Sequence, residues 1–172
     1  MNALLEPRPR RRRMTMADVE PVAAIEAAAY AHPWSRGNFV DSLAAGYLAE
    51  VLASPRDGLL GYFVAMPVVD ELHLLNLTVA PAWQGRGLGR ALLDAVEAHG
   101  RALGLVALWL EVRQSNERAR GLYRRRGFVE VGRRPGYYPA ALGRREDAIV
   151  MRCLLPPEAD AHPGSDDTDA LD

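Results

Sequence analysis

The segment from Ala80 to Leu93 places the strongest constraint on what this chain can fold into. Its sequence, APAWQGRGLGRALL, carries glycines at three alternate positions and follows an apolar stretch of strand length, Leu72–Val79. The residues from Leu88 onward then show apolar positions at helical spacing. The order strand, glycine-rich loop, helix therefore predicts an α/β unit whose loop can gather backbone N–H groups.

Three glycines and two arginines indicate what this loop binds. Gly85, Gly87 and Gly89 allow the backbone to turn so that successive N–H groups point toward one place. The free N–H groups at the start of the following helix add partial positive charge, and Arg86 and Arg90 add full charges. A phosphate or pyrophosphate is the expected ligand. The alternative is a plain turn between a strand and a helix.

Two better-known phosphate motifs do not fit this spacing. A dinucleotide-binding fingerprint needs a third glycine where Arg90 stands, and a P-loop needs a lysine, which the chain lacks. The run QGRGLGRALL after a strand instead resembles the pyrophosphate-binding loop of the GNAT N-acetyltransferases. This resemblance implies acetyl-CoA as the co-substrate.

The composition is that of one soluble domain. Of 172 residues, 49% are apolar and 25% are charged, and no apolar run approaches the ~20 residues of a membrane span. The single cysteine, Cys153, has no partner for an internal disulfide and fits a reducing cytosol, so we expect a cytoplasmic protein without a membrane partner. The four histidines are far apart in sequence, so no metal site is expected.

Charge is concentrated at the two ends of the chain. Residues 1–13 carry five arginines and one glutamate, whereas residues 158–172 carry six acidic residues and no basic one. RNA binding by Arg8–Arg13 is an alternative to a solvated sheet edge, but the edge is favoured and no direct nucleic-acid binding is expected. We expect a loose basic arm over residues 1–9, one domain over residues 10–155 and an acidic disordered tail over residues 156–172.

The hydrophobic periodicity predicts a mixed sheet flanked by helices. Strands are expected at residues 10–15, 47–53, 59–69, 72–79, 106–112, 128–138 and 145–155. Helices are expected at residues 19–30, from Ser35 to 43, from the glycine loop to about 104, and from Ser115 or Asn116 to 126. This order indicates an α/β protein with a largely antiparallel sheet, and it resembles the GNAT fold over residues 10–155.

Glu111 is the most informative residue outside the loop. In ALWLEVR, Leu108, Leu110 and Val112 share one face of the strand, while Trp109 and Glu111 share the other. A carboxylate beside an indole in a strand must be solvated, paired with one of the many arginines, or used in catalysis. Its position at the carboxyl end of a strand beside the phosphate loop favours catalysis.

Tyr123 has two interpretations from the residues alone. In ARGLYRRRGF it lies on a plausible inward face of a helix with Ala119 and Leu122, where a tyrosine is most often a core residue. Its hydroxyl is also suited to protonate a departing thiolate. The sequence leaves both roles open.

Four further segments narrow the resemblance. HPWS at 32–35, LWLEVRQSN at 108–116, GLYRRRGF at 121–128 and GYYP…REDAIVM near the end are similar to the bacterial ribosomal-protein alanine N-acetyltransferases. This resemblance implies acetylation of the N-terminal alanine of a small-subunit ribosomal protein, with Glu111 as general base and Tyr123 as general acid. It implies cofactor contacts at Leu77, Thr78, Val79, Gly85, Arg86, Gly87, Leu88, Gly89, Arg90 and Asn116.

The acceptor side is less constrained by sequence. Trp34, Tyr137 and Tyr138 are candidates for the peptide slot, although they also suit a core. One alternative is a GNAT enzyme acting on another amine, such as a lysine, a polyamine or an aminoglycoside. The other is a non-catalytic acyl-CoA-binding module, against which the presence of both Glu111 and Tyr123 argues. A monomer is expected, with a ribosomal protein's N-terminal segment as its partner.

Overall fold

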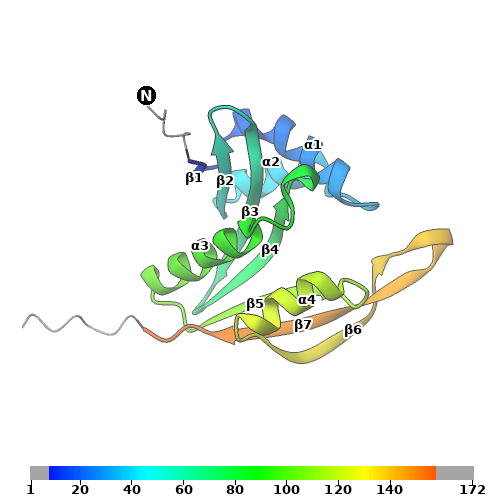
Figure 1. Cartoon of the computed structure of the whole chain (residues 1–172). Coiled ribbons are helices and arrows are strands. Elements are labelled where there is room, and N and C mark those ends of the chain that lie inside the picture. The colour runs from blue at the N-terminus through cyan, green and yellow to red at the C-terminus, as the bar shows by residue number, and fades with distance from the viewer. Residues whose placement is uncertain (1–7, 158–172) are drawn as a thin grey trace, which may run out of the picture.

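The computed structural model describes residues 8–157 (Figure 1). Its regular elements begin at Arg10 and end at Leu154. Most of the predicted basic arm and nearly all of the predicted acidic tail therefore lie outside the described residues, and both remain predictions. Within the described part of the chain, no helix is long and apolar enough to cross a membrane.

Seven strands form one sheet in the order β1-β2-β3-β4-β5-β7-β6. Neighbouring strands are antiparallel except β4 and β5, which are parallel. This confirms the predicted mixed, largely antiparallel sheet. The strands are β1 (Arg10–Arg13), β2 (Leu48–Ser54), β3 (Gly58–Val68), β4 (Glu71–Val79), β5 (Ala107–Arg113), β6 (Val129–Pro139) and β7 (Arg145–Leu154).

Three of the four described α-helices follow capping residues that the sequence predicts, and α3 begins after Gly87, which makes no side-chain cap. The described α-helices are α1 (Val19–Ala29), α2 (Arg36–Ala44), α3 (Leu88–Ala102) and α4 (Glu117–Arg125). Thr15 and Asp18 form the capping box before α1. Ser35 caps α2 by accepting a 3.2 Å hydrogen bond from the Asn38 N–H, and Asn116 caps α4 by accepting one of 3.1 Å from the Ala119 N–H.

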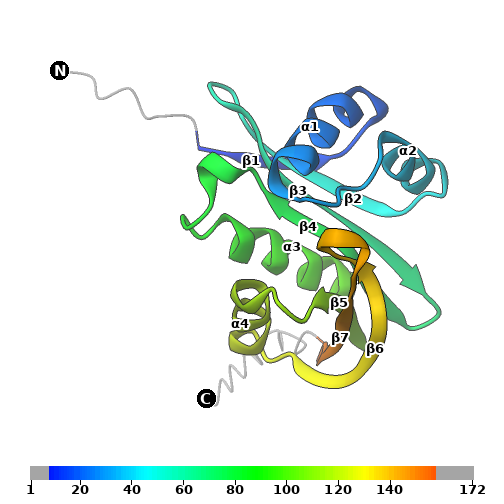
Figure 2. The same ribbon diagram turned by 90° about the vertical axis from the view of Figure 1, so that its right-hand side faces the viewer.

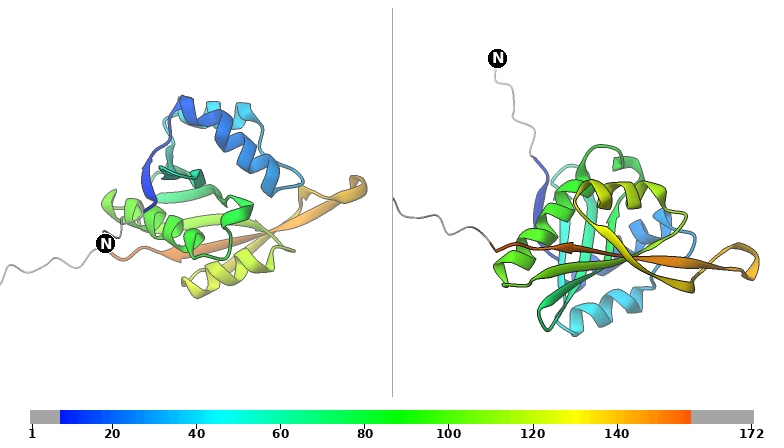
Figure 3. Two further views of the ribbon diagram at one scale, coloured as in Figure 1. Left: turned by 45° about the horizontal axis from the view of Figure 1, so that its top comes forward. Right: turned by 90° about the horizontal axis from the view of Figure 1, so that it is seen from below.

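The sheet has a separate apolar core on each face. Figures 2 and 3 show α1 and α2 on one side of the first four strands and α3 on the other. Because successive strand residues point to opposite faces, Tyr62 and Val64 pack with α1 and α2, whereas Phe63 packs with α3. Tyr123 of α4 and Phe128 extend the core on the α3 side of the sheet over β5 and β7. The two cores fix the helices that surround the site.

The structure departs from the sequence-based boundaries at several strand ends, and the predicted first strand ends at Arg13 rather than at Thr15. The prediction that Val69 belongs to a strand is wrong, because it is an exposed turn residue with φ of 54° between β3 and β4. In β6 the pairing with β7 jumps from Arg134 opposite Ala148 to Tyr138 opposite Glu146. This irregularity contains Gly136, whose N–H donates a 2.8 Å hydrogen bond to Asp147. It makes β6 bulge at the rim of the site.

Candidate active site

A split between the two parallel strands opens the site. β4 and β5 pair only from Glu71 opposite Ala107 to Leu74 opposite Leu110, and beyond this point they separate, while β4 stays paired with β3 and β5 with β7. A cavity of about 830 Å³ lies at the split, lined by residues of α1, β4, β5, α3 and α4. Ligands of open α/β sheets bind at such places, beyond the carboxyl ends of parallel strands. Figure 1 shows the divergence of β4 from β5.

The glycine loop forms one end of this cavity. Gly85 and Gly87 have φ of 77° and 80°, a left-handed conformation that residues with a Cβ adopt at a cost, and α3 begins at the next residue, Leu88. A Cβ at Gly87 would meet no atom within 4 Å, so backbone conformation is what requires glycine there. Gly89 has no positive φ and lies in the first turn of α3. Two of the three glycines, rather than all three, therefore form the turn.

Positive charge surrounds the loop. Arg90 lines the cavity, whereas Arg86 is outside the lining and its guanidinium lies 4.5 Å from the centre of the Trp83 ring. Arg118 of α4, which the sequence-based prediction omitted, donates a 3.4 Å hydrogen bond to Gln84. Gln84 in turn donates to the carbonyl oxygen of Val79 at 3.1 Å. Arg118 thus adds a guanidinium to the loop from a separate helix, and the cradle suits a pyrophosphate.

The end of β4 connects the loop to the centre of the cavity. Leu77 and Val79 line the cavity, whereas the side chain of Thr78 is buried. Opposite this region the register of β3 shifts, because Val64 faces Asn76 and Ala65 faces Leu74. Leu75 is therefore the extra residue of a bulge in β4. Past this bulge the edge of β4 that faces β5 is unpaired, and the contact of Leu77–Val79 with the cofactor stays a prediction.

Glu111 lies on β5 at the centre of the cavity wall. Its carboxylate forms a 2.9 Å ion pair with Nε of Arg134 on β6, and both side chains remain partly accessible to water. Tyr137 also interacts with this carboxylate. Both interpretations of Glu111 thus describe the same residue: it has an arginine partner and it faces the cavity. An ion pair with so exposed an arginine contributes at most about 1 kcal/mol, so a substrate cation can replace the arginine.

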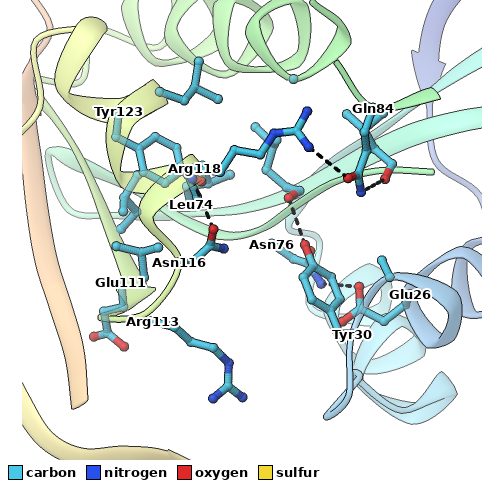
Figure 4. A pocket seen from close by; sticks show the side chains of 18 of the residues that line it. Glu26, Tyr30, Leu74, Asn76, Gln84, Glu111, Arg113, Asn116, Arg118 and Tyr123 are labelled. Carbon is cyan, nitrogen blue, oxygen red and sulfur yellow. Dashed lines mark hydrogen bonds between the residues drawn. The ribbon is translucent and has the colours of Figure 1, made fainter. Parts of the chain in front are cut away.

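Tyr123 reaches the same cavity from α4 (Figure 4). It is 8% exposed and packs 5.5 Å, centre to centre, from the ring of Phe128. Burial is the main cause that raises the pKa of its phenol, helped by the nearby Tyr30 and Tyr138. A raised pKa keeps the proton on the hydroxyl throughout the neutral range. The residue is therefore both a core residue and a proton-bearing group at the cavity.

The remaining predicted residues are Asn116, predicted to contact the cofactor, and the three candidates for the peptide slot. Asn116 and Trp34 line the cavity, and so does Tyr138, whose ring stacks under Arg113 at 4.5 Å. Tyr137 lies outside the lining on the bulged part of β6, where it is 43% exposed. Of the three proposed peptide-slot residues, the structure thus brings two into the cavity and leaves Tyr137 at its rim.

Glu26 and Tyr30 are cavity residues that sequence reasoning missed. Glu26 is 2% exposed and is the only acidic residue in the otherwise small and apolar stretch VAAIEAAAY. That isolation was the available signal, because a carboxylate on a buried helical face needs hydrogen-bond partners.

Within residues 8–157 there is no group of three or more His, Cys, Asp or Glu side chains that could hold a metal ion.

The sheet order, the split strands and the glycine cradle together define an acyl-CoA-dependent acyltransferase. Residues 19–128 match the model of the Acetyltransferase (GNAT) family. The chain belongs to the GNAT family, whose acetyltransferases use acetyl-CoA.

The curated relatives are more specific in their names. The chain is 38% identical over 138 residues to the [ribosomal protein bS18]-alanine N-acetyltransferase of Haemophilus ducreyi, covering 80% of this chain and 94% of the relative. It is 41% identical over 135 residues to the Escherichia coli K12 protein of the same name, covering 78% and 89%. The crystal structure of the E. coli ribosomal-protein-S18-alanine N-acetyltransferase superposes with a TM-score of 0.80 at 35% identity, covering 89% of this chain and 97% of that one.

Proposed function

We propose that this protein transfers the acetyl group of acetyl-CoA to the α-amine of the N-terminal alanine of ribosomal protein bS18. Enzymes named for this reaction align with about four fifths of the chain at 38–41% identity. The observation that carries the proposal is that Glu111 of β5 and Tyr123 of α4 face one cavity that ends in the glycine loop. A carboxylate and a phenol beside a pyrophosphate cradle suit amine acetylation by a thioester.

The cofactor end of the cavity fits acetyl-CoA. The left-handed Gly85 and Gly87 expose N–H groups at the start of α3, and Arg90 and Arg118 add positive charge beside them. Leu77 and Val79 then lead from this cradle to the two proton-transfer groups. Acetyl-CoA supplies the acetyl group as a thioester, while the protein holds its pyrophosphate and orients the reactive end.

Glu111 acts as the general base. An N-terminal α-ammonium has a reference pKa near ~8, so a large share is protonated at neutral pH and cannot attack a thioester. Glu111 accepts that proton, directly or through water, once the ammonium has replaced Arg134 beside its carboxylate. The amine nitrogen then forms the new C–N bond as the C–S bond breaks, and it releases a second proton to solvent, from which Tyr123 regains the proton that it gives to sulfur.

Tyr123 acts as the general acid. The sulfur leaves with the bonding electron pair and needs one proton to become a thiol. Because burial raises the pKa of Tyr123, its hydroxyl still carries a proton at the pH of the reaction. It donates that proton toward the sulfur, and the overall products are an N-acetyl peptide and coenzyme A. In this scheme the α-amine attacks the thioester directly. The enzyme therefore needs no nucleophile of its own, and no acyl-enzyme forms.

The proposed acceptor also indicates the compartment in which the enzyme acts. Ribosomal proteins are made in the cytoplasm, and we propose that the enzyme acts there as a monomer and without a metal ion. Trp34 and Tyr138, with Tyr137 at the rim, contact the first residues of the acceptor segment in this proposal. No direct contact with nucleic acid is required.

Mass spectrometry of a panel of acceptors tests the proposed function. The protein is incubated with acetyl-CoA and with a bS18 N-terminal peptide, the same peptide with a blocked α-amine and an internal lysine, a polyamine and an aminoglycoside. We expect acetylation of the free alanine α-amine alone. Acetylation of the lysine or of the small amines, or of no member of the panel, would contradict the proposal.

A further inference from the structure

A buried carboxylate on the acceptor side of the cavity has only uncharged partners among the described residues. Glu26 of α1 accepts hydrogen bonds from the Trp34 N–H at 2.9 Å, from Nδ2 of Asn76 at 3.1 Å and from the Tyr62 hydroxyl. These donors come from the loop after α1, from β4 and from β3. The carboxylate therefore joins three elements of the fold beside the cavity.

The carboxylate fixes the direction of a chain of hydrogen bonds. Because carboxylate lone pairs accept, the amide of Asn76 must turn its NH₂ group toward Glu26 and its oxygen toward Thr78. That amide oxygen can only accept, so the Thr78 hydroxyl donates its one proton to it at 2.8 Å. Thr78 then has only lone pairs left for its 2.9 Å contact with the Tyr30 hydroxyl.

Tyr30 must consequently be the donor in its contact with Thr78. Its only other described oxygen partner is the carbonyl of Leu77 at 3.5 Å, which also only accepts. The phenolic proton is therefore directed to the protein in either case. Burial raises the pKa of Tyr30, so the hydroxyl stays protonated and this direction is kept at neutral pH. The oxygen of Tyr30 is left with a free lone pair at the cavity that Tyr30 lines.

The position of that lone pair suits an amine. Figure 4 shows Tyr30, Glu26 and Asn76 on one side of the cavity, with Tyr123, Glu111 and Asn116 on the other. The Tyr30 hydroxyl lies over Leu77 on the free end of β4, and it is close enough to Tyr123 to influence the titration of that phenol. An amine bound at the Tyr30 oxygen thus lies beside Leu77 of β4 and faces Glu111 and Tyr123 across the cavity, so that its proton can reach Glu111 through water.

We propose that the Tyr30 oxygen accepts a hydrogen bond from the acceptor α-amine and that Glu26 is the positioning residue that keeps this oxygen an acceptor. The inference rests on the proposed function and adds a residue that binds its acceptor. The α-ammonium has three N–H groups; one proton goes to Glu111 and another is held by Tyr30. This hydrogen bond is made to the bound acceptor and is kept during the attack, so it contributes to acceptor affinity rather than to kcat.

Kinetics of Tyr30→Phe on the alanine peptide test the contact. The substitution removes one oxygen and keeps the ring. We expect the KM for the peptide to rise roughly ten-fold, the value of a hydrogen bond to a charged group, with kcat nearly unchanged and acetyl-CoA affinity intact. Tyr47→Phe is the matched control, because Tyr47 precedes β2 outside the cavity lining, and it should leave both constants unchanged.

Glu26→Gln tests the direction of the hydrogen bonds that run from Glu26 through Asn76 and Thr78 to Tyr30. The new amide must keep its oxygen on the Trp34 N–H, so its NH₂ faces Asn76, whose amide then turns over and reverses the bonds through Thr78 to Tyr30. We expect the peptide KM to rise as in Tyr30→Phe. In the double variant Glu26→Gln/Tyr30→Phe the KM should equal that of Tyr30→Phe alone, whereas a separate structural effect of Glu26 would add to it.

Each result has a defined meaning. A wild-type protein that acetylates no peptide overturns the proposed function and this inference together. An active wild type with unchanged Tyr30→Phe kinetics, or a loss of acetyl-CoA affinity in that variant, overturns the inference alone.

If Glu26→Gln lowers the melting temperature too far for assay, Thr78→Val tests the same series of hydrogen bonds. It removes the nearer acceptor of the Tyr30 proton and leaves only the Leu77 carbonyl at 3.5 Å among the described partners. An unchanged peptide KM there would show that Glu26 does not set the direction at Tyr30, which would contradict the positioning role.

Discussion

The two ends of the cavity are built in different ways. The cofactor end is made of consecutive backbone: the end of β4, the turn at Gly85 and Gly87, and the first turn of α3. The acceptor end is made of side chains from four separate elements, with Glu26 on α1, Asn76 on β4, Glu111 on β5 and Tyr138 on β6. Apart from Arg118 of α4, the cofactor end is set by a single local sequence, whereas the acceptor end is set only by the completed fold.

This difference predicts how each end responds to substitution. A backbone cradle depends on φ and ψ, so it is damaged by a residue that cannot adopt the required conformation. A side-chain site depends on individual donors and acceptors, so it loses function with a single atom. Variants at the two ends should therefore separate acetyl-CoA affinity from turnover and acceptor affinity.

Glu111→Gln should have the largest effect. The amide keeps the shape but accepts no proton, and kcat should fall by roughly 10²–10⁴. The loss should shrink as the pH is raised, because the α-amine is then neutral without help. Steady-state rates on the alanine peptide between pH 6 and about pH 9 measure both effects.

A matched variant separates catalysis from the ion pair at Glu111. Arg134→Gln breaks the same ion pair and leaves the carboxylate in place. It should lower kcat far less, because an exposed pair contributes at most about 1 kcal/mol. Equal losses in the two variants would mean that Glu111 serves the fold rather than the reaction.

Tyr123→Phe should have the next largest effect. Removing the proton donor should slow turnover by about 10², at the lower end of what general acid catalysis contributes. The defect should persist at high pH, because the missing proton is needed at sulfur rather than at nitrogen. Acetyl-CoA affinity and melting temperature are measured in parallel, since Tyr123 also packs on Phe128. Full activity would show that water supplies the proton and that Tyr123 only packs.

Gly87→Val tests the backbone-built end. A β-branched residue at φ of 80° is strained by about 1–3 kcal/mol, so the turn should shift and acetyl-CoA should bind roughly ten- to a hundred-fold more weakly. Gly46→Val is the control, because Gly46 has φ of 75°, an equally open surrounding and no place in the cavity. Calorimetry should find normal affinity there. Equal losses in both variants would point to general destabilisation instead.

A chain ending at Pro157 should show the smallest effect. Every residue that lines the cavity lies between Glu26 and Pro139, and β7 ends at Leu154. Melting temperature and rate should therefore stay as in the full chain. A loss of several degrees, measured by thermal unfolding, would show that the acidic residues after 157 contribute to stability.

Most of the fold could be predicted because its signals are local. Ser35 and Asn116 cap helices that begin at the next residue, and the alternation in ALWLEVR gives β5 and the face of Glu111. The turn at Gly85 and Gly87 is likewise contained in a few consecutive residues. Signals of this kind can be interpreted without knowing which elements meet in space.

The acceptor end could not be predicted in the same way. Glu26 and Tyr62 are 36 residues apart, and Tyr30 and Thr78 are 48 apart, so their contacts exist only after α1 has packed on the sheet. The pairing of Glu111 with Arg134 likewise depends on β6 lying beyond β7 and on its bulge. Sequence provided the residue types there but not their partners.

Binding of a conjugate that joins the two ends tests the central claim most directly. Coenzyme A is linked through sulfur and an acetyl bridge to the α-amine of an alanine-starting bS18 peptide, and its affinity is compared with that of coenzyme A by calorimetry. If the ends form one cavity around the α-amine, the conjugate should bind roughly 10²–10⁴ times more tightly than coenzyme A. An isomer joined through a lysine ε-amine should gain little. A conjugate that binds no better than coenzyme A, or an isomer that binds equally well, would contradict the account.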